Sequence, residues 1–352
     1  MILPGQTIGI LGGGQLGRMI AMAAAQLGYR CHVFAPEADS IAAEVCAAYT
    51  RADWHDADAM ARFAAACDVV TFEFENVPVS ALAALGDVPL YPGRKALEIG
   101  QDRLSEKRFI EELGGRPAPY APVDSAADLA AAIAAIGAPG ILKTRRDGYD
   151  GKGQWRIMQA DDASALDLPA TPLIYEGFVT FFAEFSVILC RGADGEVRFW
   201  DSAKNRHDSG ILALSTVPAP ADVLAQVPAA RELAAKAAEA LGYVGVLAIE
   251  FFATETGPVF NEMAPRVHNS GHWTTEGAVI SQFENHVRAV CGLPLGDTRL
   301  AAKAVEMRNL IGDDAADVAG LLADPANHLH LYGKAEARPG RKMGHVTRLV
   351  LD

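Results

Sequence analysis

The stretch Ile141–Gln154, ILKTRRDGYDGKGQ, determines how the rest of this chain is interpreted. Lys143 lies in an apolar, strand-like run, and Gly148, Gly151 and Gly153 predict a turn before a second strand. The spacing differs from the G-x-x-x-x-G-K-[ST] loop, which must open a helix. A glycine-rich hairpin beside a strand lysine is typical of sites where backbone amides cover nucleotide phosphates and the lysine adds a fixed charge. By itself the segment is also compatible with a plain glycine turn and a surface lysine.

Acidic and amide side chains follow on later predicted strands. Glu176 ends the apolar run LIYEG, and the backbone of Gly177–Val179 after it could contact an adenine edge and a ribose. Glu250 lies in AIEFF, while Asn261 and Glu262 lie in FNEMAPR, and the turn ETG joins these two runs. Mg²⁺ takes few hard oxygen ligands from protein and the rest from phosphate and water. Each acid alone could be a half-exposed strand carboxylate, but together and in this order they favour a nucleotide site.

The first glycine motif lies in Thr7–Ser40, where Gly12, Gly14 and Gly17 form G-x-G-x-x-G between an apolar run and an Ala-rich helix. A dinucleotide site also needs an acid near the end of the second strand. That strand ends VFAPEADS, which places Glu37 beyond a proline. The motif therefore predicts only that amides at a helix start hold an anion. A mononucleotide or sugar phosphate, a dinucleotide, and a purely structural tight turn all remain open.

The order of predicted elements indicates two classes of sheet. The first hundred residues alternate strands (TIGIL, CHVFA, DVVTFEF) with helices, which predicts a parallel, doubly wound sheet. From Pro117 onwards, strand runs separated by short turns predict a mixed or antiparallel sheet. The tail HLHLYGKAEARPGRKMGHVTRLVLD is basic and strand-like in an otherwise acidic chain.

Composition narrows the class of partner. The 352 residues are 50% hydrophobic, and 44 acidic against 31 basic residues give a net charge of -13. We therefore expect a globular protein that binds neither nucleic acid nor a membrane. The odd number of cysteines and the lack of a C-x-x-C spacing predict reduced thiols, and we expect a cytoplasmic protein. The cysteines are Cys31, Cys46, Cys67, Cys190 and Cys291.

The motifs as a set resemble the ATP-grasp ligases, and within them the family that carboxylates an aminoimidazole ribonucleotide in purine biosynthesis. The resemblance rests on GILGGGQLGRM, TFEFENV, DGYDGKGQ, FNEMAPRVHNSGHWT and HLYGKAEARPGRKMGHV, which are spread over nearly the whole chain. It implies an α/β and α+β protein with an ATP-grasp fold. A Rossmann-like pre-ATP-grasp domain would span 1–100, an ATP-grasp domain 101–298 with a glycine-loop lid at about 117–180, and a small β-rich C-terminal domain 299–352.

The resemblance also implies how ATP and metal are held. Glu250 and Glu262 would carry Mg²⁺, with Mn²⁺ as the alternative, between the phosphates of ATP. ATP itself would be bound by cationic, loop and hinge residues. These are Arg103, Lys143, Gly148, Tyr149, Asp150, Gly151, Lys152, Gly153, Gln154, Glu176, Gly177, Phe178, Val179, Glu184, His207, Asn261 and Glu262.

The second substrate would bind near the first glycine motif and the basic tail. The catalytic residues implied are Lys143, Tyr149, Asp150 and Arg266, with Asp150 or released phosphate as the proton acceptor and Arg266 as a planar fork for bicarbonate. Lys334 and Arg341 would clamp a 5'-phosphate, unless the tail is only a solvated basic edge strand. The substrate-binding residues are Gly14, Gln15, Leu16, Glu73, Asn76, His268, Asn269, Lys334 and Arg341.

The implied reaction uses ATP, bicarbonate and 5-aminoimidazole ribonucleotide, and gives ADP and phosphate through carboxyphosphate. The resemblance suggests a homodimer. Two alternatives remain at this stage: another ATP-grasp carboxylate-amine ligase, and an NAD-dependent oxidoreductase built on the N-terminal glycine motif.

Overall fold

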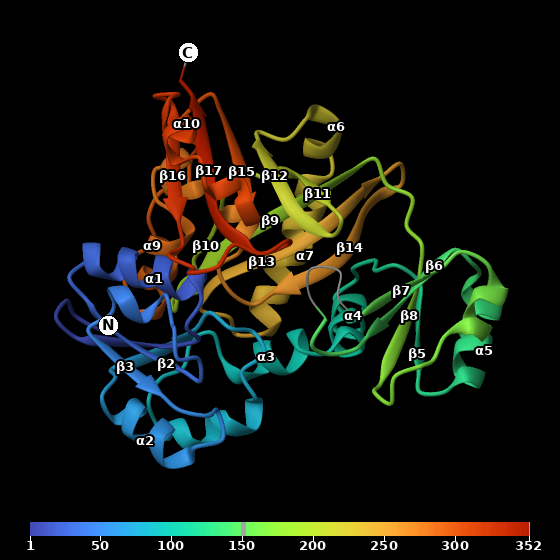
Figure 1. Ribbon diagram of the computed structural model, residues 1–352, viewed down its shortest axis with the longest axis horizontal. Coiled ribbons are helices and arrows are strands. Elements are labelled where there is room, and N and C mark those ends of the chain that lie inside the picture. Colours follow the sequence, from blue (N-terminus) through green and yellow to red (C-terminus); the bar gives the residue numbers. More distant parts are fainter. Residues whose placement is uncertain (149–152, 352) are drawn as a thin grey trace.

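The computed structural model describes residues 1–148 and 153–351, and its N-terminal part is a parallel sheet in the order β3-β2-β1-β4 (Figure 1). One face packs on α1 through Ile10 and Val33, and the opposite face packs on α2 through Phe34 and Phe72. The predicted doubly wound sheet is therefore confirmed. Its elements are β1 (Thr7–Leu11), α1 (Gln15–Gln26), β2 (Arg30–Ala35), β3 (Ala48–Arg51), α2 (Ala57–Ala65), β4 (Val69–Phe72) and the 3-10 helices η1 (Ala43–Val45) and η2 (Val79–Leu85).

A four-stranded antiparallel sheet, which we call the lid sheet, lies away from the N-terminal sheet, at the right of Figure 1. Leu142 and Tyr175 from its strands pack with Leu129 and Ile133 of α5 in a small core of their own. The lid sheet has the order β5-β8-β6-β7. The elements that lead to it and form it are α3 (Arg94–Gly100), α4 (Arg103–Glu112), β5 (Tyr120–Val123), α5 (Ala126–Ile136), β6 (Gly140–Thr144), β7 (Gln154–Ile157), η3 (Ala160–Ala165) and β8 (Leu173–Gly177).

The third sheet is antiparallel and runs β14-β13-β9-β11-β12-β15-β17-β16, with β10 beside β9. The β-rich C-terminal segment continues this sheet, because β15 pairs with β12. Its strands are β9 (Ala183–Arg191), β10 (Val197–Phe199), β11 (Ala203–Asp208), β12 (Ile211–Val217), β13 (Gly245–Thr254), β14 (Gly257–Ala264), β15 (Ala304–Ile311), β16 (Asn327–Leu331) and β17 (Lys342–Val350). The helices are α6 (Ala221–Leu224), α7 (Val227–Ala240), α8 (Thr274–Gly277), α9 (Gln282–Val290) and α10 (Val318–Leu322), with η4 (Asn269–Gly271) and η5 (Gly312–Ala315).

One face of the large sheet changes character along its strands, and this change positions the site. Under α9 the face is apolar, with Ile188 on β9 and Ala248 on β13 in the core. Farther along the same face lie two carboxylates: Glu184, four residues before Ile188 on β9, and Glu250, two residues after Ala248 on β13. Because alternate strand residues share a face, carboxylates emerge where the helix cover ends. Within the described residues no helix is both long and apolar enough to cross a bilayer.

Candidate active site

Two lysines and a carboxylate are buried where the lid sheet meets α4. Lys143 Nζ on β6 lies 2.9 Å from Glu176 Oε2 on β8, and Lys107 Nζ on α4 lies 3.3 Å from the same oxygen. Burial by itself raises the pKa of Glu176, but the two lysines outweigh it and hold that pKa at about 2. Burial lowers the pKa of Lys143. The carboxylate therefore stays ionised. Its other oxygen, Oε1, is buried and has no hydrogen-bond partner among residues 1–148 and 153–351.

Arg103, the first residue of α4, connects this cluster to the large sheet. Its guanidinium donates to the Gly148 carbonyl at 3.2 Å and lies 3.6 Å from Glu262 Oε2 on β14. Gly153 lies at the other end of the glycine loop and has φ +67. A Cβ atom added to it would lie 2.7 Å from Thr144 Oγ1. A glycine is required there because L side chains rarely adopt this φ.

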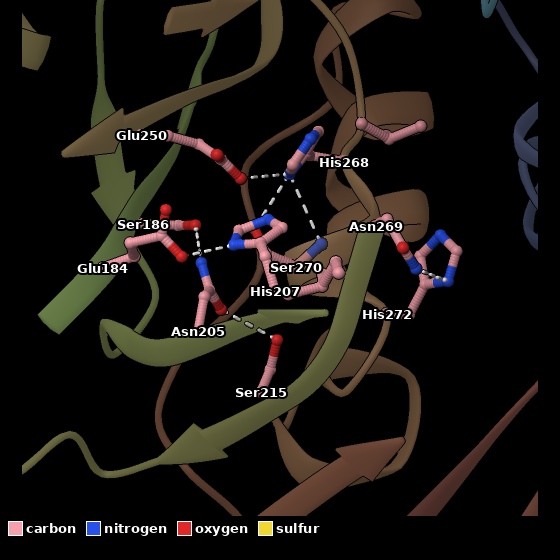
Figure 2. A network of polar contacts seen from close by, with 12 residues as sticks. Glu184, Ser186, Asn205, His207, Ser215, Glu250, His268, Asn269, Ser270 and His272 are labelled. Atoms are coloured by element: carbon pink, nitrogen blue, oxygen red, sulfur yellow. Dashed lines mark hydrogen bonds and ion pairs between the residues drawn. The ribbon is translucent and has the colours of Figure 1, made fainter. Parts of the chain in front are cut away.

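Opposed carboxylates lie at the end of the helix cover on the large sheet. Glu250 on β13 pairs in register with Glu262 on β14, and burial together with the charge of Glu262 raises the pKa of Glu250 to about 7. His207 Nδ1 lies 2.5 Å from Glu184 Oε2, and His268 Nδ1 lies 3.8 Å from Glu250 Oε1 (Figure 2). Burial opposes the protonation of His207, but the carboxylate of Glu184 raises its pKa.

These carboxylates fit a hard divalent cation bound together with phosphates. The raised pKa of Glu250 reflects two acids that repel each other in a buried place, and a cation would relieve that repulsion. No group of three or more His, Cys, Asp or Glu side chains within 1–148 and 153–351 is arranged to hold a metal by itself. Mg²⁺ uses one or two carboxylates of a protein and takes its other ligands from phosphate and water.

The N-terminal glycine loop is occupied by a carboxylate of the protein itself. Gly14 N–H donates to Glu73 Oε1 at 2.7 Å, and Glu73 comes directly after β4. An ideal Cβ on Gly12 would lie 2.6 Å from Glu73 Oε1, and one on Gly17 would lie 3.1 Å from Glu73 Cγ. Burial raises the pKa of Glu73, while the amides of Gly14 and Gly17 and the charge of Arg266 lower it. The carboxylate therefore takes the place where a dinucleotide site holds its pyrophosphate.

Arg266 lies next to this loop and is held by an acid from the same segment as Glu73. Its Nη2 lies 2.7 Å from Glu75 Oε2, and the Arg266 side chain is largely buried. Asn76 follows in the same loop and is half-buried. The structure thus places Glu75 against Arg266 and Glu73 within range of its charge.

The chain matches three families in sequence order. A ribonucleotide synthetase preATP-grasp domain matches residues 5–101, an ATP-grasp domain matches residues 108–283, and a phosphoribosylaminoimidazole carboxylase C-terminal domain matches residues 306–351. A Brucella melitensis protein named N5-carboxyaminoimidazole ribonucleotide synthase is 53% identical to this chain over 352 residues, which cover 98% of this chain and 97% of that protein. The chain belongs to the N5-carboxyaminoimidazole ribonucleotide synthase family.

Solved structures agree with this assignment. The N5-carboxyaminoimidazole ribonucleotide synthetase from Thermus thermophilus superposes with a TM-score of 0.90 and 49% identity, over 97% of this chain and 93% of that one. The Aspergillus clavatus synthase in complex with ADP and 5-aminoimidazole ribonucleotide gives a TM-score of 0.91 and 32% identity, over 98% of this chain and 94% of that one. The expected fold class, an ATP-grasp protein with a Rossmann-like N-terminal part, is confirmed.

In this N5-carboxyaminoimidazole ribonucleotide synthase family member, several predicted ATP residues lie together near α4, the lid sheet and the large sheet, and others do not. The structure brings Arg103, Lys143 and Glu176 together, and on the large sheet it places Glu184 beside His207 and Glu250 opposite Glu262. Asn261 precedes Glu262 on β14, and Gln154 begins β7. The predictions for Tyr149, Asp150, Gly151 and Lys152 lie outside the described residues.

The side chains of the hinge after Gly177 line a cavity that is separate from Lys143 and Glu176. Phe178 is 48% exposed, and with Val179 it lines a cavity of about 510 Å³ that residues 116–119 and 254–256 also line. Lys143 and Glu176 do not line this cavity. Any contact of Phe178 and Val179 with a nucleotide beside Lys143 and Glu176 would therefore come from the backbone.

The predicted second-substrate residues lie in three places. Gln15 is half-buried at the start of α1, whereas the Leu16 side chain packs into the core behind the loop. Lys334 Nζ donates to the Lys342 carbonyl at 2.7 Å, and Arg341 donates to the Glu336 carbonyl at 2.8 Å. His268 and Asn269 lie on the turn after Arg266 (Figure 2).

Three charged residues of the site were missed from the sequence. Lys107, Glu106 and Glu75 were not among the predicted site residues, yet Lys107 and Glu106 are buried and Glu75 is half-buried. Glu106 accepts the Met263 N–H at 2.6 Å, and burial raises its pKa to about 8. A signal was present, because Arg103 and Lys107 lie four residues apart and share one face of a helix.

Proposed function

We propose that this chain carboxylates 5-aminoimidazole ribonucleotide to 5-(carboxyamino)imidazole ribonucleotide with ATP and bicarbonate, and releases ADP and phosphate in de novo purine biosynthesis. The observation that carries the proposal is Arg103, whose guanidinium contacts both the carbonyl of Gly148 in the glycine loop and Glu262 on the large sheet. It joins the lid cations to the opposed carboxylates, as a site for a polyphosphate and its cation requires. Homology to synthases of this name over nearly the whole chain supports the same reaction.

Bicarbonate is a poor electrophile, and transfer of the γ-phosphoryl group from ATP makes it reactive as carboxyphosphate. Phosphoryl transfer depends mainly on positioning and on neutralising charge. Lys143 and Arg103 would supply fixed positive charge, and the ionised Glu176 would keep the lysine in place. When bound, Mg²⁺ would neutralise phosphate charge, and Glu250 and Glu262 would hold it, with Mn²⁺ as the alternative.

The amine of the ribonucleotide would attack the carbon dioxide released beside it. Arg266 would bind bicarbonate through its planar fork, since Glu75 fixes one side of the guanidinium. Gln15 and Asn76 would contact the ribonucleotide next to the loop that Glu73 fills. Lys334 and Arg341 would bind its 5'-phosphate. Asp150 or the released phosphate would accept the proton of the amine.

Several wider properties belong to the same proposal. We place the domain boundaries near residues 100 and 298, with the lid subdomain at about 117–180. The protein would act in the cytoplasm as a homodimer. Carboxyphosphate hydrolyses easily, so closure of the lid over the nucleotide would exclude water.

The decisive experiment measures ADP release by the purified protein with each combination of bicarbonate and 5-aminoimidazole ribonucleotide, in the presence of Mg²⁺. We expect full turnover only when bicarbonate and the ribonucleotide are both present. The carboxylated product should then contain the label of labelled bicarbonate. Turnover with an amino acid or with formate in place of bicarbonate would identify another ATP-grasp ligase. No ADP release under any combination would contradict the proposal.

A second experiment tests the basic tail. Lys334→Ala should raise the KM for the ribonucleotide by at least about tenfold, the loss of one charged phosphate contact, and leave the KM for ATP nearly unchanged. Equal changes in both constants would mean that the tail has only a structural role.

A further inference from the structure

A chain of buried polar side chains connects the C-terminal strands to the turn that follows Arg266. Asn309 Nδ2 on β15 donates to the Leu212 carbonyl at 2.7 Å and to Asn269 Oδ1 at 2.8 Å. Asn269 Nδ2 donates back to Asn309 Oδ1 at 2.9 Å and lies 3.1 Å from His272 Nδ1, and Figure 2 shows this last contact. Each of these three polar side chains is exposed by 9% or less.

The carbonyl of Leu212 fixes the direction of these bonds. A carbonyl only accepts, so the amide nitrogen of Asn309 must point to it and the amide oxygen must face Asn269. Asn269 then offers one amide hydrogen to Asn309 and the other to His272 Nδ1. His272 Nδ1 is therefore an acceptor, and the neutral ring carries its hydrogen on Nε2. Burial supports the neutral ring, because it lowers the pKa of His272 well below its ordinary value.

Tyr332 extends the chain to β17. Its hydroxyl lies 3.1 Å from His272 Nδ1 and 2.9 Å from His345 Nδ1, and it has one hydrogen to donate. If Tyr332 donated its hydrogen to His345, its hydroxyl oxygen would face His272 Nδ1, and both atoms are acceptors. Donation to His272, with His345 Nδ1–H donating to the hydroxyl oxygen, pairs a donor with an acceptor in each contact, and Asn269 and Tyr332 then share the lone pair of His272 Nδ1. Tyr332 and His345 are exposed by 1% and 0%.

We infer that Asn309, Tyr332 and His345 are positioning residues that hold the turn 266–272 in place through His272 and Asn269. Both amide hydrogens of Asn269 are used within the protein, so its side chain acts by fixing the turn. Lys334 Nζ lies 5.6 Å from the centre of the Tyr332 ring, which places the basic tail against the same chain of bonds. The inference rests on the proposed function, because it assigns Arg266 and Lys334 to one ribonucleotide and bicarbonate site.

Tyr332→Phe tests the inference, because it removes only the hydroxyl. The variant should raise the KM for 5-aminoimidazole ribonucleotide about tenfold, the equivalent of one buried hydrogen bond, and change the KM for ATP less than about twofold. Tyr29→Phe is the matched control, since Tyr29 is buried and its hydroxyl donates to the Ile2 carbonyl at 2.7 Å. It should lower the melting temperature without changing either KM. The same KM values in both variants would overturn the inference.

His345 provides a rescue test with the same readout. His345→Asn keeps a donor near the position of Nδ1 and should retain a KM for the ribonucleotide near that of the wild type. His345→Leu removes the donor and should behave like Tyr332→Phe. If both variants raise the KM for the ribonucleotide equally, the hydrogen bond to Tyr332 has no role in positioning.

A spectroscopic test does not depend on activity. The ¹⁵N shifts of the His272 ring should show Nε2–H in the wild type and a shift of Nδ1 in Tyr332→Phe. Nδ1–H in the wild type would overturn the assigned chain. A wild type without bicarbonate-dependent turnover but with the expected shifts would contradict the proposed function and keep the hydrogen-bond chain. An active wild type whose KM values are unchanged by Tyr332→Phe would contradict the positioning role.

Discussion

The loop after β1 and the lid edge at β6 both place glycines next to charge, but they differ in the balance of that charge. At the N-terminal loop one carboxylate of the protein meets backbone amides, because Glu73 Oε1 accepts the Gly14 N–H at 2.7 Å. At the lid, Lys107 and Lys143 share one oxygen of Glu176, and Arg103 lies 3.6 Å from Glu262.

The difference shows what a glycine motif can and cannot indicate. The glycines at positions 12, 14 and 17 indicate that a group approaches the backbone closely. Here that group is the buried side chain of Glu73. The motif is silent on whether the group belongs to a ligand or to the protein. Clustered buried cations are more informative, because at the lid two lysines share one carboxylate oxygen and a ligand's phosphates could supply further negative charge.

The largest expected effect is at the lid. Lys143→Ala should lower bicarbonate-dependent ADP release at least about 100-fold, because a preorganised cation at the transferred phosphoryl group is lost. Lys236→Ala is the matched control, since Lys236 lies in an exposed ion pair with Glu232 at 2.7 Å. The control should keep its activity. Turnover at the wild-type rate in Lys143→Ala would show that the lid is not part of the catalytic site.

The N-terminal loop should respond in stability. Gly14→Ala would place a Cβ 2.9 Å from Glu73 Oε1, and we expect the free energy of unfolding to fall by about 3 kcal/mol from crowding and a weakened buried bond. The backbone of Gly14 has φ -88, which alanine accepts, so strain in φ does not contribute. Gly93→Ala is the control, because nothing lies within 4 Å of its Cβ position.

A double-mutant cycle isolates the contact. In a Glu73→Ala background the crowding disappears, and Gly14→Ala should cost less than about 1 kcal/mol. Denaturant unfolding of the four proteins measures the coupling. Additive costs would show that Glu73 is not what the glycines accommodate.

The sequence predicted the elements better than the contacts between them. Apolar runs such as TIGIL and AIEFF became β1 and part of β13, because alternation and burial act within a few residues. The pairing of Glu250 with Glu262 also followed from a short turn between two strands. Such features depend on local sequence, which can be examined directly.

The contacts that the sequence did not reveal join distant segments. Glu73 meets the glycine loop across 59 residues, and Asn309 meets Asn269 across 40 residues. Lys107 lies on a helix face that could equally have faced water, and only the closeness of Glu176 explains its burial. Sequence patterns contain the residue types but not which segments fold together.

The junction of the N-terminal sheet and the large sheet should make the protein sensitive to acid. His286 on α9 accepts the Val246 N–H of β13 at Nδ1, 3.1 Å away, and its Nε2 lies 2.8 Å from Thr71 Oγ1 on β4. Burial lowers its pKa from 6.5 to about 4. The unfolded chain therefore binds a proton between pH 6.5 and 4 that the folded chain does not, so stability falls as pH falls through this window.

His286→Asn should flatten that dependence. It keeps an acceptor for the Val246 N–H and removes the proton-binding ring, so the stability lost between pH 7 and pH 5 should shrink by about 2 kcal/mol. Unfolding in urea at the two pH values measures this difference. His55→Asn, at an exposed position, is the control and should leave the dependence unchanged. An unaltered dependence in His286→Asn would place the acid sensitivity elsewhere.

The smallest effect bears directly on the two glycine regions. ATP with Mg²⁺ at about ten times its Kd should stabilise the protein by about 1.4 kcal/mol, because it binds only the folded state. NAD at the same concentration should give no shift in melting temperature, since Glu73 takes the place of its pyrophosphate. A shift with NAD that disappears in Gly14→Ala would mean that Glu73 moves aside for a ligand, and the N-terminal loop would then be an anion site like the lid.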